Sequence, residues 1–128
     1  MDRMIVRLLS EGIGTFFLCC GVGLALSLAG DLAPFMVAAS LFAAMGITGF
    51  VSGAMFNPAV TTGVIIYKSL KWDLSPNALT ELSLAYIFQF IFGLFGALMA
   101  WGISGEAHHF TVGEGYTCLL YTSDAADE

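Results

Sequence analysis

Two long runs of this chain contain no charged residue, and they limit what the chain can fold into. One run lies between Asp31 and Lys68, and the other lies between Glu81 and Glu106. Runs of about 20 apolar residues are long enough to cross the hydrocarbon core of a bilayer as a helix. Only 11% of the residues are charged, against about 25% in a soluble domain. We therefore predict an all-α integral membrane protein, with the lipid bilayer as its first partner.

The apolar pattern and the turn residues divide the chain into three predicted membrane spans and one shorter helix. Ser75 is suited to cap the third span, and Pro76 suits the first turn that follows. The shorter helix would measure about 16 Å at about 1.5 Å per residue, which is about half of the hydrocarbon core. The predicted spans cover residues 8–29, 32–50 and 78–103, and the shorter helix covers residues 57–67.

The shorter helix begins with Asn57 and Pro58, in the middle of an apolar region. Asn57 is a good N-cap residue, and Pro58 suits the first helical position because its missing N–H would have no intrahelical partner. We expect residues 51–56 before it to be non-helical at membrane depth, which is tolerated only where backbone is buried in protein or lines a water-filled cavity. A helix N-terminus there presents a partial positive charge. These residues predict a polar site that favours water or another hydrogen-bonding solute and repels cations.

The positive charges indicate how the spans are oriented. Arg3 and Arg7 precede the first span, Lys68 and Lys71 precede the third, and the chain has no other Lys or Arg. If residues 57–67 enter and leave the membrane on one side, all four cations lie on the cytoplasmic side, as the positive-inside bias expects. The charges therefore favour a re-entrant segment and a cytoplasmic N-terminus. Four cations are also too few for a nucleic-acid partner.

Two stretches of the sequence resemble the aquaporin and glycerol-facilitator family, the major intrinsic proteins. The stretch SGAMFNPAV, residues 52–60, resembles the first Asn-Pro-Ala loop of the family, and EGIGTFF, residues 11–17, resembles its first-helix signature. The order of spans and loop agrees over roughly residues 5–105. The resemblance implies three transmembrane helices plus a re-entrant half-helix, the first of two inverted repeats. It also implies passive transport of water or small uncharged solutes such as glycerol, without a cofactor, in a homotetramer of the plasma or cell inner membrane.

The resemblance assigns roles to the residues of the loop. Asn57 would donate a hydrogen bond to the permeating molecule at the centre of the pore, and Pro58 and Ala59 would shape the turn and meet the second motif. Three carbonyl groups would form part of a ladder of acceptors along the pore. These carbonyl groups belong to Gly53, Ala54 and Met55.

The resemblance also assigns roles to residues of the spans. Glu11 would accept hydrogen bonds from the buried backbone of the loop. Val37, which lies 20 positions before Asn57, would occupy the selectivity-filter position. Val37 is smaller than the aromatic residue often found there, so it favours a filter wide enough for glycerol-sized solutes. The expected pore wall comprises Leu18, Leu41 and Phe56.

Some polar and small residues have simpler explanations. Glu11 could instead extend toward the membrane edge, because it lies only one turn inside the first span. Cys19 and Cys20 are expected to pack as small apolar side chains, and Gly93 and Gly96 to allow close helix packing. His108 and His109 lack further ligands for a metal. Neither a Ser-His-Asp nor a Cys-His arrangement is supported, so we do not expect an enzyme.

The last residues, Cys118 to Glu128, do not resemble the family. They resemble a translated transposon-end sequencing adapter, so we expect residues 1–117 to be the first repeat and residues 118–128 to be a non-native tail. The missing partner would then be the second repeat of the same chain. Two alternatives remain: a natural three-span half-channel that dimerises, and a non-conducting membrane protein with a structural or interaction role.

Overall fold

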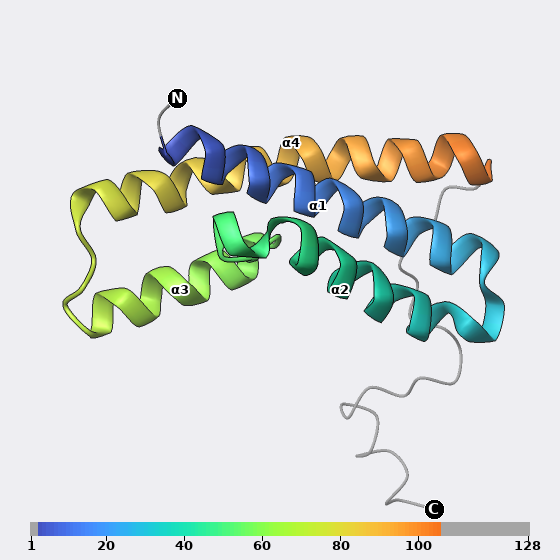
Figure 1. Ribbon diagram of the computed structural model, residues 1–128, viewed down its shortest axis with the longest axis horizontal. Helices are drawn as coiled ribbons and strands as arrows, with labels where there is room; N and C mark the ends of the chain where they lie inside the picture. The colour runs from blue at the N-terminus through green and yellow to red at the C-terminus, as the bar shows by residue number, and fades with distance from the viewer. Residues whose placement is uncertain (1–2, 106–128) are drawn as a thin grey trace, which may run out of the picture.

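The computed structural model describes residues 3–105, and this part of the chain consists of helices joined by short connections. Three helices are long and apolar enough to cross a membrane, as the sequence predicts. In Figure 1, α1 and α4 lie side by side and run in the same direction, and α2 runs back along α1. After α2 the helical structure is interrupted near the middle of the molecule. From there α3 leads to the end where α1 and α4 begin. The elements in order are α1 (Arg3–Leu28), η1 (Gly30–Leu32), α2 (Ala33–Ser52), α3 (Pro58–Leu70) and α4 (Pro76–Ser104).

The helices extend beyond the predicted bounds at several ends. α1 begins at Arg3 rather than at residue 8, because charged residues can extend a helix beyond the apolar core of a span. The prediction that all of residues 51–56 are non-helical is wrong for Val51 and Ser52, which form the last turn of α2. α3 continues to Leu70, three residues past the predicted end, because nothing in Lys68–Leu70 breaks a helix.

The two predicted helix starts are confirmed. Asn57 has an extended backbone, and its Oδ1 accepts a hydrogen bond of 2.8 Å from the N–H of Ala59. Ser75 caps α4 in the same way, with its Oγ accepting from the N–H of Ala78 at 3.2 Å. A proline follows each cap, where no intrahelical donor is lost. Local chemistry therefore fixes where α3 and α4 begin.

Glycine allows α1 and α4 to approach closely. A Cβ atom on Gly96 would lie 2.5 Å from the carbonyl oxygen of Phe16 and 3.1 Å from the backbone nitrogen of Cys20. A Cβ on Gly93 would be in ordinary contact with Cys19 and Thr15, at 3.4 Å from each. The expectation of close packing is confirmed, and the constraint is strictest at Gly96, because the atoms it faces belong to backbone.

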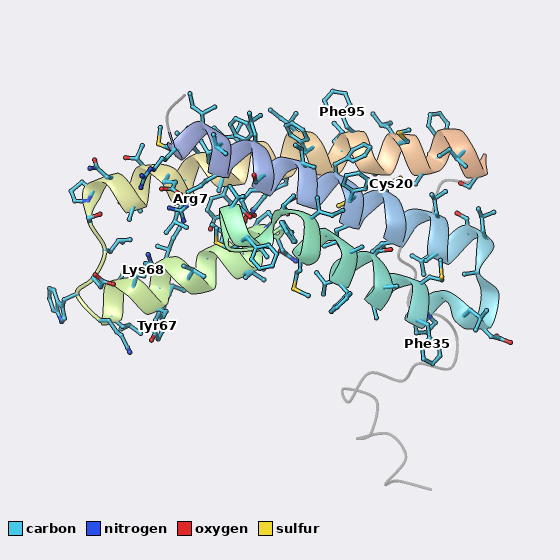
Figure 2. All side chains as sticks on the ribbon, in the orientation of Figure 1. Arg7, Cys20, Phe35, Tyr67, Lys68 and Phe95 are labelled. Carbon is cyan, nitrogen blue, oxygen red and sulfur yellow. The ribbon has the colours of Figure 1, made fainter. Side chains whose placement is uncertain are left out.

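Large apolar side chains lie mostly on the outside of this bundle. Phe50 is 94% exposed, and Phe35 and Phe95 point away from the helices in Figure 2. The buried apolar positions include small residues, which let helices approach when lipid supplies no hydrophobic drive between them. They include Ala25, Ala44, Ala85 and Ala100. This distribution fits helices that face lipid.

Candidate functional site

The connection between α2 and α3 is a short non-helical segment with an unusual backbone. Gly53 has φ 96°, Ala54 has φ 57° and Phe56 has φ 48°. Positive φ is unfavourable for residues with a Cβ atom and tends to persist at functional sites, where surrounding contacts hold it. The Oγ of Ser52 supplies one such contact by accepting from the N–H of Ala54 at 3.1 Å. The remaining contacts come from α1.

The carboxylate of Glu11 holds this segment from the side. Its Oε1 accepts from the N–H of Met55 at 3.0 Å, and its Oε2 accepts from the N–H of Phe56 at 2.8 Å. Two successive backbone N–H groups converging on one carboxylate form a concave anion site. Glu11 is 2% exposed, so the idea that it extends toward the membrane edge is wrong. Its hydrogen bonds offset the large cost of burying a charge.

A third donor to Glu11 comes from α4. The Nε2 of Gln89 lies 3.1 Å from Oε2 of Glu11 and 2.9 Å from Oγ1 of Thr61 in α3. The Oγ1 of Thr61 is also 3.2 Å from Oε1 of Gln89, and both residues are buried. Gln89 therefore links α1, α3 and α4 through a fully buried polar network.

Sequence reasoning did not assign a role to Gln89. The available signal was a single amide side chain inside the charge-free run of the third span. In lipid such a group needs an internal partner. Within residues 3–105, every buried side-chain nitrogen and oxygen has a hydrogen-bond partner.

Asn57 and Pro58 lie at the start of α3, next to an apolar groove. The Oδ1 of Asn57 serves the cap, so its NH₂ group remains the part of the exposed side chain that can donate outward. The first N–H groups of α3 also lack intrahelical acceptors, apart from those that the cap satisfies. This end of α3 therefore concentrates donors and the positive end of a helix dipole.

The groove has a volume of about 790 Å³ and runs between α1 and α4. Four of the predicted site residues line it together: Leu18, Phe56, Asn57 and Pro58. Val37 and Leu41 lie one turn apart on α2 and do not line it. The described structure thus brings Phe56, Asn57 and Pro58 next to Leu18 in one groove, and the expected filter residue Val37 is not part of its lining.

Phe56 is held more tightly than an open pore wall requires. Its ring is packed against α1, where a Cβ on Gly14 would lie 2.1 Å from its Cε1 atom. The residue is only 2% exposed. The absence of a side chain at Gly14 therefore creates the space that receives the ring and helps to fix the loop on α1.

The backbone groups of the loop are used unequally. The N–H groups of Ala54, Met55 and Phe56 all donate within the protein. Among residues 3–105, no hydrogen bond is made to the carbonyl oxygens of Gly53, Ala54 or Met55. Donors are thus directed into the protein, and the acceptors of these three residues stay available.

The described part of the chain contains no cluster of three or more His, Cys, Asp or Glu residues that could hold a metal ion. His108, His109 and the predicted non-native tail at residues 118–128 lie outside the described residues.

No protein-family model, curated protein or solved structure matches this chain. The structure is that of a helical protein with three helices able to cross a membrane. The non-helical segment between α2 and α3 is held by hydrogen bonds to the buried carboxylate of Glu11.

Proposed function

We propose that this chain is the first repeat of an aquaporin-type channel that passes water or small uncharged solutes down their gradient. The observation that carries the proposal is the start of α3. There, the Asn57-Pro58-Ala59 motif caps a short helix, and a buried carboxylate on α1 holds the preceding loop. In this proposal α3 is a re-entrant half-helix, and its start lies near the middle of the bilayer.

The length of α3 supports this position. Its 13 residues measure about 20 Å at about 1.5 Å per residue. That is somewhat more than half of a hydrocarbon core of about 30 Å. A helix of this length that begins at the midplane reaches the edge of the hydrocarbon core near Lys68 and ends just beyond it, at Leu70.

The chemistry of the loop supports a path for neutral hydrogen-bonding solutes. The NH₂ group of Asn57 would donate a hydrogen bond to the oxygen of the solute, and the carbonyl groups of Gly53, Ala54 and Met55 would accept hydrogen bonds from its O–H groups in sequence. The positive end of α3 would oppose cations. Val37 would widen the filter once a second repeat completes it, which favours glycerol-sized solutes. The chain's own residues would need no cofactor for this transport.

The arrangement of charges supports a cytoplasmic N-terminus. Arg7 on α1 forms an ion pair of 3.1 Å with Glu81 on α4, so the beginnings of these two helices lie at the same end. α3 leads to that end in Figure 1, which brings Lys68 and Lys71 there as well. Under the positive-inside bias this end faces the cytoplasm.

The two alternatives differ from this proposal in what they require. A natural half-channel would need two copies in opposite orientations to make inverted repeats, and the single-sided cations favour one orientation. A non-conducting protein would need no solute path, but it would leave the available carbonyl groups and the exposed amide of Asn57 without a role.

Two experiments test the proposal. The first is to sequence the source gene past codon 117: a frame that continues into further spans and a second Asn-Pro-Ala-like motif supports it, and a native stop after residue 128 favours the alternatives. The second is stopped-flow light scattering of vesicles that contain the complete gene product. Osmotic permeability above that of empty vesicles supports a channel, and equal permeability contradicts it.

A further inference from the structure

The turn between α3 and α4 carries apolar side chains that the bundle does not use. Trp72 is 97% exposed, and Leu70 in the last turn of α3 is 76% exposed. Trp72 also has φ 55°, a left-handed backbone that is unfavourable for a bulky residue. Neither burial nor favourable backbone geometry within the protein explains a tryptophan at this position.

Two lysines, Lys68 and Lys71, precede this exposed indole closely in the sequence. Lys68 is in the last turn of α3, and Lys71 follows the helix with its Nζ 4.8 Å from the ring centroid of Tyr67. Figure 2 shows Tyr67 and Lys68 toward the same end of the molecule as Arg7. Arg7 is paired with Glu81, whereas neither lysine has a carboxylate within ion-pair distance among residues 3–105. Asp73 is the one acid between these lysines and α4.

The level of this turn in a bilayer follows from α4 alone. Trp72 precedes Pro76, the first residue of a helix able to span the membrane, by four positions. The turn therefore lies at the end of a span, where headgroups meet the hydrocarbon core. Trp is enriched at this level because its ring is amphipathic, and Lys extends from there to the headgroups.

We propose that residues 67–72, the basic turn, form a binding site for anionic phospholipid headgroups. Lys68 and Lys71 contact the phosphate, and the side chains of Trp72 and Leu70 enter the interface beside the acyl chains. The cation–π contact restrains the Lys71 ammonium over the ring of Tyr67. Charge complementarity selects an anionic lipid over a zwitterionic one, by about fivefold per lysine near the surface. The site depends on α4 as a membrane span and does not depend on solute transport.

Tryptophan fluorescence tests the site in the full chain. The chain has two Trp residues, so the Trp101→Phe variant leaves Trp72 as the single reporter. The variant is reconstituted in phosphatidylcholine vesicles that contain an equal fraction of either brominated phosphatidylglycerol or brominated phosphatidylcholine. Bromine quenches only nearby indoles, so the ratio of the two quenching efficiencies measures the enrichment of anionic lipid around Trp72.

We expect Trp72 to be quenched several-fold more by the brominated anionic lipid than by the zwitterionic one. Adding Lys68→Gln and Lys71→Gln should remove the preference, and so should 1 M salt, where the screening length is about 3 Å. The matched control is Trp72→Phe, which reports Trp101 near the other end of α4 and should show equal quenching by both lipids.

Two results would overturn the proposal. Equal quenching of Trp72 by both lipids would mean that the turn enters the interface without selecting anionic headgroups. Quenching by neither lipid, with full quenching by aqueous acrylamide, would mean that the turn faces water or an acidic protein partner. Because no flux is measured, either result leaves the channel proposal to its own test.

Discussion

The backbone N–H of Phe56 donates a 2.8 Å hydrogen bond to the carboxylate of Glu11, although 45 residues separate them in the sequence. The same carboxylate accepts from Met55 and from Gln89. One acidic side chain in α1 thus fixes the loop before α3 and also contacts α4. Glu11 therefore positions the start of α3 relative to α1 and α4.

Replacing Glu11 should release the loop. Glu11→Ala leaves the N–H groups of Met55 and Phe56 without acceptors, and each unsatisfied buried donor costs about 1–3 kcal/mol. We expect faster hydrogen exchange of these two amides, measured by NMR in detergent micelles. Glu11→Gln is the matched variant: it keeps the size and one acceptor oxygen, so its effect should be smaller. Unchanged exchange in Glu11→Ala would show that other contacts hold the loop.

Gly96 should tolerate no added methyl group. In Gly96→Ala the new Cβ would meet backbone atoms of Phe16 and Cys20, and forcing α1 away from α4 should cost about 1–3 kcal/mol. The control is Gly46→Ala in α2, where nothing lies within 4 Å of a Cβ. That change should stabilise the helix by about 0.5–1 kcal/mol.

Denaturant titration of both glycine variants in the same detergent measures the difference. Equal stability of Gly96→Ala and Gly46→Ala would show that the approach of α1 and α4 is looser than the structure has it.

Thr61 should matter more than an ordinary threonine. Thr61→Val keeps the shape but leaves Gln89 with a lost partner inside the protein, at about 1–3 kcal/mol. Thr80→Val is the control, because Thr80 is exposed and, among residues 3–105, its Oγ1 hydrogen-bonds only to the carbonyl oxygen of Pro76 in its own helix. Its expected change is within about 0.5 kcal/mol. Denaturant titration gives the change in the free energy of unfolding of each variant from the shift of its midpoint, provided that the slope of the transition is unchanged. Similar losses in the two variants would argue against a structural role for the Gln89 network.

The ion pair between Arg7 and Glu81 should contribute little to stability. Their side chains are 48% and 25% exposed, and pairs of this kind are worth about 0–1 kcal/mol. Glu81→Gln should therefore shift the free energy of unfolding by less than about 1 kcal/mol. A larger loss, measured by the same titration, would mean that the pair is shielded from solvent in the membrane.

The sequence predicts the structure best where an element depends on residues that are adjacent along the chain. Asn57 with Pro58 and Ser75 with Pro76 mark helix starts through local capping chemistry, and both starts are found there. The sequence predicts an end of α2 at residue 50, whereas the helix ends at Ser52, because apolar Val51 and polar Ser52 are both compatible with a longer helix. Capping marks a start sharply, and α2 has no comparable signal before Gly53.

The site could be predicted only in part, because its contacts join distant segments. The resemblance led to the expectation that Glu11 contacts the loop, and the hydrogen bonds to Met55 and Phe56 are present. The role of Gln89 depends on its helical phase relative to Thr61, 28 residues earlier, and no local rule fixes that phase. The burial of Phe56 depends on the space at Gly14, which also cannot be seen from either segment alone.

We propose that Asn57 at the start of α3 lies on a path for neutral solutes. The most direct measurement is stopped-flow osmotic permeability, for water and for glycerol, of vesicles that contain the complete gene product or its Asn57→Asp variant. Aspartate can still cap α3, but it lacks the NH₂ donors. We predict permeability well above that of empty vesicles, with a several-fold change in flux or in solute preference in the variant. Background permeability of the complete product, or identical flux and selectivity in both proteins, would contradict it.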